Sequence, residues 1–422
     1  MKTGTVEFDG VEYPDGSASD PGHLGLMQGS PPPADKRIRF EDDRILDFPQ
    51  IRWSLSHMRE LMPTVAVWRG RGAPNDRGAI SRGREESIDA LSFEDLHGRR
   101  LTWADSLTQT YTDGILVMYR GVRIYERYFG ALEPHRPHAC FSITKSYAAT
   151  LAATLIHEGL LDEGKPVAYY LPEMAGTAYE DASLRQVLDM QVGVEYSEDY
   201  TDPQAHIWSF SRAGGLRARR ADYTGPSSFY EYLVTLRKSG EHGAAFDYKT
   251  VNTEVLCWVM RRASGIGLAD MLSQRLWSRI GCEEDGYLAV DSIGVPMGGG
   301  GLNATLRDVC RFGELLRCEG AWAGRQVIPA AVVAGIRGGA DPAKFVGYPW
   351  LPGYSYRDMW WVSHNALDMF EARGIHGQRL YIVPGAEVVI ARFCSHPIAT
   401  SAGNDPVTLP AFAALCQMLT MP

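Results

Sequence analysis

Long apolar runs are missing from this chain of 422 residues. No stretch approaches the roughly 20 apolar residues that a membrane-spanning helix needs. The N-terminal sequence, MKTGTVEFDG, also lacks the charged and apolar regions of a secretory signal. We therefore expect a soluble, cytoplasmic protein that does not act at a membrane.

Metal-binding and cofactor-binding motifs are equally scarce. No CxxC pair is present, and HExxH is absent because His157 is followed by EGLL. The glycine run at residues 298–301 has neither the lysine of a P-loop nor the spaced glycines of a dinucleotide-binding turn. The seven cysteines are odd in number and widely separated, which indicates buried free thiols in a reducing compartment. We expect no metal and no organic cofactor.

A strong excess of charge of either sign is lacking too. The formal net charge is −9, and the charged residues are spread along the chain. This distribution argues against a nucleic-acid-binding surface. Length and apolar content allow one large domain or two ordinary domains, with ample material for a core.

What the chain does contain is a serine and a lysine three residues apart in an apolar segment, HACFSITKSYAATLAATLIHE. Apolar residues recur there at helical spacing, so Ser142 should open a buried helix that carries Lys145 on the same face. A desolvated amine beside a hydroxyl activates a serine nucleophile, and N–H groups at a helix start stabilise a substrate oxyanion. A two-residue pattern also arises by chance, so the prediction depends on partners downstream.

The first partner is Tyr248, in the sequence Tyr248-Lys249-Thr250 before a predicted helix. A tyrosine near both serine and lysine can take the serine proton and return it to the leaving group. An unperturbed phenol has a pKa of about 10, so the ammonium of Lys145 is needed to make that exchange accessible near neutrality. We assign Thr250 to substrate binding. The alternative for Tyr248 is an ordinary loop tyrosine.

The second partner is the segment RGIHGQ at residues 373–378, where small and polar residues interrupt a predicted strand. If this strand lines the cleft, the backbone N–H of Ile375 could pair with that of Ser142 as an oxyanion hole. His376 suggests a Ser-His-Asp arrangement as an alternative, but the lysine and tyrosine already account for proton transfer and no GxSxG elbow is present. We assign His376 to substrate binding.

The expected fold is α+β, with an antiparallel sheet of about five strands flanked by helices. Two strands form a hairpin within residues 113–130, and three more are predicted late in the chain, at residues 357–362, at 378–383 with its approach from residue 370, and at 387–393. Both chain ends would therefore contribute to one sheet.

The predicted organisation has three parts. Residues 1–40, rich in Gly, Pro, Asp and Ser, should form a mobile N-terminal arm or an extended wrap. Residues 41–165 and 285–422 should form the α/β lobe with the sheet, and residues 166–284 a mostly helical lobe. A cleft is expected at the seam where the Ser142 helix lies.

Six segments extend the pattern over most of the chain: TYTDGILVMYRG, FSITKS, VLDMQVGVEYSEDYTDP, FDYKTVNTEVLCWV, GGGLNATLRDVCRFG and GIHGQRLYIVP. In this order they resemble the serine hydrolases of β-lactamase or penicillin-binding-protein fold. Within these, the resemblance is to the 6-aminohexanoate-dimer hydrolases, which cleave nylon oligomers, and to class C-like esterases. It implies Ser142 as nucleophile, Lys145 and Tyr248 as proton relay and Ile375 as oxyanion donor, with Tyr200 as a substrate contact on a mobile loop.

Two positions depart from that family's pattern and bear on the substrate. An aspartate that favours the amine of the nylon dimer corresponds to Ser211, a substrate-facing position, and a loop asparagine corresponds to Gly299. Penicillin-type relatives carry Lys-Thr-Gly before the oxyanion strand, whereas this chain has Ala372-Arg373-Gly374, without the lysine that helps hold the antibiotic carboxylate. Small-ester hydrolysis is therefore expected more than strong nylon-oligomer or β-lactamase activity.

We expect a serine hydrolase that cleaves carboxylic esters or linear, 6-aminohexanoate-oligomer-like amides through an acyl-enzyme on Ser142. The alternatives are a β-lactamase or D-amino-acid peptidase, and a catalytically silent ligand-binding protein of the same fold. The expected partner is a small-molecule ester or amide, without nucleic acid or membrane, and the chain could form a homodimer.

Overall fold

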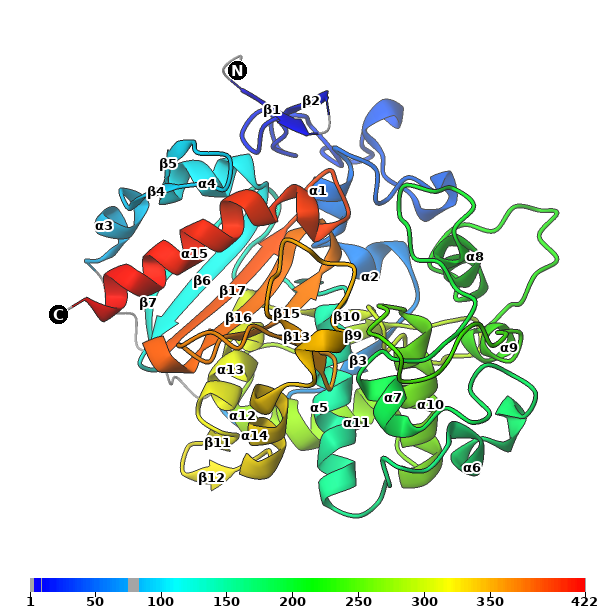
Figure 1. Cartoon of the computed structure of the whole chain (residues 1–422). Coiled ribbons are helices and arrows are strands. Elements are labelled where there is room, and N and C mark those ends of the chain that lie inside the picture. The colour runs from blue at the N-terminus through cyan, green and yellow to red at the C-terminus, as the bar shows by residue number, and fades with distance from the viewer. Residues whose placement is uncertain (1–3, 9, 75–82, 422) are drawn as a thin grey trace.

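A sheet of seven antiparallel strands forms the centre of the computed structural model, which describes residues 4–8, 10–74 and 83–421 (Figure 1). The strand order is β13-β14-β15-β16-β17-β6-β7, so early and late parts of the chain share one sheet, as the sequence predicts. The strands are β6 (Thr112–Tyr119), β7 (Val122–Tyr128), β13 (Ser355–Arg357), β14 (Trp360–Val362), β15 (Phe370–Gly374), β16 (Gln378–Val383) and β17 (Val388–Cys394).

The sheet has more strands than the five or so predicted, because two predicted runs contain tight reversals. Asp358 and Met359 adopt φ of 48° and 58°, which turns residues 357–362 into the hairpin of β13 and β14. Two successive residues at positive φ make a turn whose twist suits paired antiparallel strands. In the same way His376 and Gly377, with φ of 61° and 96°, separate β15 from β16.

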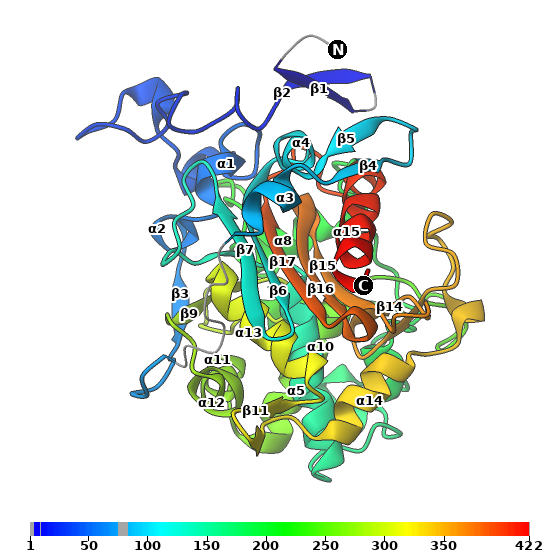
Figure 2. The ribbon, with the colours of Figure 1, turned by 90° about the vertical axis from the view of Figure 1, so that its left-hand side faces the viewer.

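Helices cover both faces of this sheet, because successive side chains of a strand point to opposite faces. Leu380 of β16 faces α13 (Leu306–Arg317), where a Cβ on Gly313 would come within 2.7 Å of the leucine Cδ1. The next residue, Tyr381, faces α15 (Asp405–Thr420), with its ring centroid 5.3 Å from that of Phe412. α4 (Trp103–Gln109) joins α15, and α5 (Ile143–His157) lies on the side of α13 (Figure 2).

The regular elements within residues 166–284 are helices joined by long loops, and the longest of them, α10 (Val251–Ser264), packs against α5. The other helices of this region are short: α6 (Val167–Tyr170), α7 (Leu184–Leu188), α8 (His206–Ala213), α9 (Phe229–Leu233), α11 (Leu268–Leu272) and α12 (Ser278–Ile280). The exact division of the chain into an arm and two lobes stays a prediction.

A second sheet contains the strand that directly precedes Ser142 in the chain. Its four strands, in the order β3-β9-β10-β8, are β3 (Thr64–Val67), β8 (His138–Ala139), β9 (Gly286–Ala289) and β10 (Leu302–Ala304). β8 ends three residues before Ser142, and β10 holds it by pairing Asn303 with Ala139. The glycine run at residues 298–301 directly precedes β10, so it also lies close to Ser142.

The N-terminal segment packs against the rest of the molecule. β1 (Thr5–Phe8) and β2 (Val11–Pro14) form a hairpin, and the Phe8 ring lies 4.4 Å, edge on, from that of His396. Further along, Leu26 and Ile38 are buried in a cluster with the short helices α1 (Ile51–Ser54) and α2 (Met58–Leu61). Residues 10–46 therefore contribute to the apolar core.

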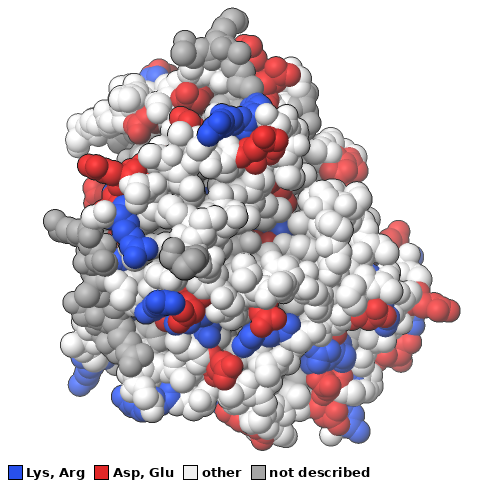
Figure 3. Space-filling view, turned by 60° about the vertical axis from the view of Figure 1, so that its left-hand side comes forward, with Lys and Arg blue, Asp and Glu red and all other residues white. Residues whose placement is uncertain are grey.

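Two surface features bear on partners. Within the described ranges, none of the helices combines the length and the apolar character that crossing a membrane requires. On the face shown in Figure 3, acidic and basic side chains are interspersed, and neither sign gathers into a large patch.

Candidate active site

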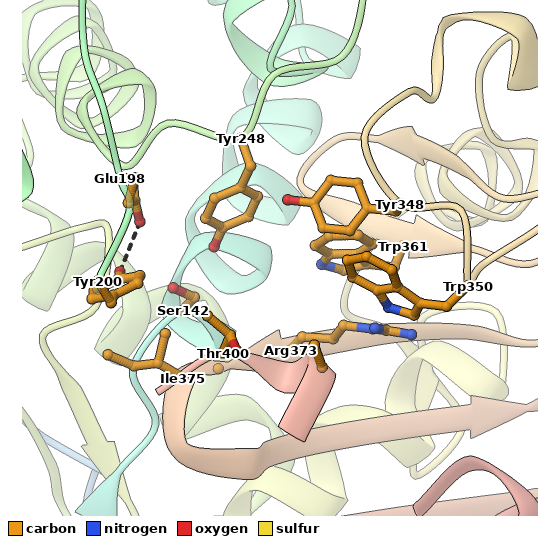
Figure 4. Close-up of a pocket in the computed structure, with 12 residues that line it drawn as sticks. Ser142, Glu198, Tyr200, Tyr248, Tyr348, Trp350, Trp361, Arg373, Ile375 and Thr400 are labelled. Carbon is orange, nitrogen blue, oxygen red and sulfur yellow. Dashed lines mark hydrogen bonds between the residues drawn. The ribbon is translucent and has the colours of Figure 1, made fainter. Parts of the chain in front are cut away.

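Ser142 lies at the first turn of α5, where the sequence predicts a helix start, and its side chain lines a cavity of about 270 Å³ (Figure 4). The preceding residue, Phe141, has φ of 43°. A bulky side chain rarely adopts this conformation, which costs of order 1–3 kcal/mol and persists only where the surroundings impose it. The strained residue turns the chain sharply from β8 into α5 and places Ser142 at the turn.

Lys145 lies one helical turn further, and its amine is buried against the serine. Its Nζ donates to Ser142 Oγ at 2.8 Å and to the carbonyl oxygen of Gly299 at 2.5 Å. Burial lowers the pKa of Lys145 to about 8, although the negative charges of Glu198 and Glu254 act in the opposite direction. A large fraction of this amine is therefore neutral near pH 8 and able to accept the serine proton.

Glu254, on the first turn of α10, organises the glycine run that contacts Lys145. Its carboxylate accepts hydrogen bonds from the backbone N–H groups of Gly299, at 2.7 Å, and Gly298, at 3.0 Å. Burial raises the pKa of Glu254 to about 7, against these two hydrogen bonds and Lys145. A Cβ on Gly299 would lie 2.5 Å from Thr250 Cγ2, so only glycine fits between Glu254, Thr250 and the lysine.

Tyr248 points its hydroxyl toward Ser142 from the loop before α10 (Figure 4). Lys145 Nζ lies 5.0 Å from the centroid of its ring. Burial and the charge of Glu198 raise the pKa of Tyr248 well above its ordinary value, although a hydrogen bond with Ser142 acts to lower it. This is opposite to the direction expected from a neighbouring ammonium, so the phenol is a proton donor at neutral pH rather than a base.

Glu198 connects the remaining residues on this side of the cavity. Its carboxylate accepts the Tyr200 hydroxyl at 2.9 Å, the Thr250 hydroxyl at 2.7 Å and the Thr250 backbone N–H at 2.6 Å. Tyr200 and Thr250, both assigned to substrate binding, each line a cavity next to Ser142, although Glu198 engages both of their hydroxyls. Glu198 therefore links the loop that carries Tyr200 to Thr250, which follows Tyr248 and Lys249 in the chain.

Ile375 follows β15 and lies beside Ser142 in the cavity lining (Figure 4). The end of β15 approaches the segment before Ser142 so closely that a Cβ on Gly374 would lie 2.7 Å from the Cys140 carbonyl oxygen. Glycine is required at this contact because any side chain would push the two segments apart. The geometry thus brings the backbone of Ile375 next to the start of α5.

Two other predicted residues have their polar atoms engaged inside the protein. His376 is buried, its ring Nδ1 lies 2.7 Å from the His396 carbonyl oxygen, and burial lowers its pKa to about 4. His376 is absent from the linings of both cavities at Ser142, so its assignment to substrate binding has no support in this geometry. The Ser211 hydroxyl donates to the Ile207 carbonyl oxygen at 2.7 Å, although the residue does line a cavity.

Two cavities meet at Ser142, and Tyr200 and Ile375 line both. The first, of about 270 Å³, has an aromatic wall that includes Tyr248. The other aromatic residues of that wall are Tyr348, Trp350 and Trp361, as Figure 4 shows. The second cavity, of about 100 Å³, extends on the other side of the serine and is mainly aliphatic.

Arg373 also lines the first cavity, but its guanidinium is paired with two carboxylates that do not line it. Its Nε donates to Glu371 at 2.9 Å, and its Nη1 donates to Asp405 at 3.1 Å. This pairing leaves little of its charge for a substrate carboxylate.

Sequence reasoning missed Glu198, Glu254 and Arg373. For Glu254 a signal was available, since it lies between Val251 and Val255, which are both buried in α10. A carboxylate on the apolar face of a helix needs a buried partner. Glu198 and Arg373 carry no comparable signal, because their partners come from distant segments.

No group of three His, Cys, Asp or Glu side chains that could hold a metal occurs in the described part of the chain. Cys140, close to the serine, is buried, which raises the pKa of its thiol and keeps it protonated. The site's polar groups are a hydroxyl, an amine, a phenol and backbone N–H groups, which together can perform acyl transfer.

The fold and this set of groups define a class, the Ser-x-x-Lys hydrolases. The sequence profile of the Beta-lactamase family matches residues 104–408, and the chain belongs to that family. It is 34% identical over 355 residues to a 6-aminohexanoate-dimer hydrolase of Paenarthrobacter ureafaciens, covering 83% of this chain and 86% of that protein. These matches confirm the predicted α+β fold, the family resemblance and the hydrolase class.

Solved structures of other proteins share this fold. One from Bacillus anthracis, provisionally named a 6-aminohexanoate-dimer hydrolase, has a TM-score of 0.80 and 30% identity, covering 89% of this chain and 96% of that chain. A family VIII carboxylesterase shares the fold with a TM-score of 0.55 and 17% identity, over 72% of this chain and 92% of the other.

Proposed function

We propose that the chain is a serine hydrolase that cleaves carboxylic esters or linear amides through an acyl-enzyme on Ser142. The observation that carries the proposal is the hydrogen bond of 2.8 Å from the buried Lys145 amine to the Ser142 hydroxyl, at the point where two cavities meet. A hydroxyl next to a buried amine is activated as a nucleophile, so we interpret this contact as catalytic rather than structural.

In the first step the neutral form of Lys145 takes the Ser142 proton while Oγ attacks the substrate carbonyl. The oxyanion of the tetrahedral intermediate accepts hydrogen bonds from the backbone N–H groups of Ser142 and Ile375. Tyr248 gives its phenolic proton to the leaving group as the carbonyl–leaving-group bond breaks. The proton on Lys145 then passes to the tyrosinate, which restores both groups and leaves the acyl-enzyme.

Water completes the reaction by the same route. Lys145 takes a proton from the attacking water, and the acid leaves as Ser142 regains its proton. Gly299 and Glu254 hold the amine in place throughout, since the Gly299 carbonyl oxygen accepts from Nζ and Glu254 fixes the Gly299 peptide.

A family member of this fold could also be a penicillin-directed enzyme or a silent binding protein. The cavity offers no lysine in place of the Lys-Thr-Gly lysine, and Arg373 is already paired with Glu371 and Asp405. We therefore expect hydrolysis of nitrocefin to be far slower than hydrolysis of simple esters. A silent binding protein would leave Ser142 unlabelled by a fluorophosphonate probe.

The direct test is labelling with a fluorophosphonate, followed by peptide mass spectrometry, in the wild type and in Ser142→Ala. We expect one adduct, on Ser142, and loss of p-nitrophenyl acetate hydrolysis by about 10⁴-fold or more in the variant, with an unchanged melting temperature. Retained hydrolysis in the pure variant would rule the mechanism out. The cytoplasmic location and the homodimer remain predictions, and sedimentation velocity measures the latter.

A further inference from the structure

The two cavities that meet at Ser142 have different chemistry, and their positions relative to Tyr248 give each a role. A proton donor must reach the leaving-group atom, so the leaving group lies on the side of Tyr248. Tyr248 lines the aromatic cavity and is absent from the lining of the second cavity. If the proposed function holds, the acyl part of the substrate therefore extends into the second cavity.

The second cavity is built from aliphatic and thioether side chains that come from four parts of the chain. Its apolar lining includes Ile45, Met58, Met62, Ile207, Leu216 and Met297. Ile45 belongs to the N-terminal segment, which is held over the cavity by the ion pair of Asp43 with Arg217, at 3.1 Å. Such a surface recognises apolar groups, because burying them removes them from water.

Most polar side chains of this lining have partners within the protein, but the buried Asn303 Oδ1 has no hydrogen-bond partner among the described residues. The Ser211 and Thr250 hydroxyls donate to Ile207 and Glu198, and the Asn303 amide Nδ2 donates to the Gly301 carbonyl oxygen at 3.0 Å. Arg217 is paired with Asp43, as above. Among the described residues that line the cavity, none is an aspartate or glutamate.

We propose that the second cavity is the acyl-chain subsite and that it takes an uncharged aliphatic acyl chain of four or five carbons. A volume of about 100 Å³ holds roughly three or four groups of the size of a water molecule, at about 30 Å³ each. With the carbonyl carbon at Ser142, these groups correspond to the remaining carbons of butanoyl and pentanoyl. A cationic end group would enter without a carboxylate to pair with, which is costly.

The test measures kcat/KM for p-nitrophenyl esters from acetate to decanoate. Each added methylene that enters the cavity should raise kcat/KM by about fourfold, up to pentanoate, after which the gain should stop. A flat profile, or a maximum at acetate, would overturn the proposal.

The charge requirement is tested with an isosteric pair that fits the cavity, p-nitrophenyl butanoate and p-nitrophenyl 3-aminopropanoate, whose amine is an ammonium at neutral pH. These acyl groups have the same shape and differ by one positive charge. We expect the neutral ester to be hydrolysed about tenfold faster or more, because the cavity offers the cation no carboxylate. Equal rates, or a faster cationic ester, would contradict the subsite.

The location is tested with Leu216→Trp, which fills the cavity from a half-buried position. The ratio of pentanoate to acetate turnover should fall by about tenfold, the cost of the two or so methylenes displaced. The matched control is Leu160→Trp, since Leu160 is 48% exposed and lines neither cavity. An equal ratio in both variants would place the acyl chain elsewhere.

These outcomes separate the subsite from the proposed function. Absence of labelling at Ser142 and of acetate hydrolysis would defeat the hydrolase itself. Labelling and acetate hydrolysis without a dependence on chain length or charge would defeat the subsite alone. Because the ester series uses the wild-type protein, its result does not depend on the folding of any variant.

Discussion

Two groups of buried charges lie beside the same cavity, and they behave differently. The first is Lys145 with Glu254, next to Ser142. The second is a cluster in which Arg373 and Arg379 are paired with Glu371 and Asp405. All of these side chains are buried, so burial alone does not distinguish a reactive group from a structural one.

The difference lies in where burial and pairing together leave each pKa. Burial would raise the pKa of Glu371, but Arg373 and Arg379 outweigh it and hold that pKa below its ordinary value. Around the serine the carboxylates do not outweigh burial, and the pKa values of Lys145 and Glu254 move to about 8 and about 7. Burial and the charge of Arg373 lower the pKa of Arg379 to about 10, so the pairing in this cluster is not complete, yet Arg379 stays charged at neutral pH. A buried charge whose pKa stays far from neutrality is inert, whereas one whose pKa lies near neutrality can move protons.

The largest effect expected from this comparison is that of Lys145→Met. Turnover of p-nitrophenyl acetate should fall by about 10⁴-fold or more, because the base and the contact that orients Ser142 are lost together. The free energy of unfolding should stay equal or rise, since an incompletely paired amine leaves the interior. Urea denaturation and steady-state kinetics measure the two effects.

Lys249→Met is the matched control, because Lys249 is another buried lysine, adjacent to Tyr248, but is paired with Asp247 at 2.6 Å. It should reduce stability more than turnover. If Lys249→Met lost turnover as completely as Lys145→Met, pairing would not be what separates reactive from structural charges.

The second prediction breaks the structural cluster. Asp405→Asn removes a carboxylate shared by Arg373 and Arg379 and should lower the free energy of unfolding by about 3–5 kcal/mol, because it leaves buried guanidinium charge unpaired. Asp368→Asn breaks an exposed pair with Arg337 and should cost less than about 1 kcal/mol. Equal losses in urea denaturation would show that burial of the pair is irrelevant.

The third prediction concerns the proton donor. Tyr248→Phe should slow cleavage of a linear amide by about 100-fold or more, because an amine leaves only with a proton. Hydrolysis of p-nitrophenyl esters should suffer less, since p-nitrophenolate needs none. Tyr356→Phe removes a hydroxyl from a ring 6.1 Å away and serves as control. Matched losses on amides and esters would exclude the donor role.

The smallest effect is a displacement of the pH profile. In the wild type kcat/KM should rise with pH through about 8, because Lys145 must lose its proton to act as base. Glu254 raises the pKa of Lys145, so Glu254→Gln should move this rise to lower pH. Glu314→Gln, a change at a buried carboxylate paired with Arg317, should overlay the wild type. A rise unmoved in Glu254→Gln would exclude coupling to Lys145.

Local sequence signals predicted much of this molecule. The helical spacing after Ser142, the loop before α10 and the β-rich runs that became β6, β7, β16 and β17 all correspond to observed elements. They were predictable because periodicity and short-range spacing depend on neighbouring residues. The hairpin of β13 and β14 was missed, since its turn at Asp358 and Met359 contains no glycine to mark it.

The candidate site divides in the same way. Ser142 and Lys145 could be paired from their spacing, because one helical turn brings residues three apart together. The partnership of Glu254 with Gly299 could not, because nothing local to either residue specifies a contact across 45 positions. Nor could the direction of the Tyr248 pKa be predicted, since it depends on burial by distant segments.

The order of residues along the chain thus determines the proposed nucleophile, the amine three residues later, the helix that carries both and the family. The folded molecule decides the rest: which charges are left incompletely paired, that His376 turns inward, and that an aliphatic cavity opens beside the serine. The physical reason is that periodicity acts over a few residues, whereas dielectric environment and cavity shape arise only when remote segments pack together.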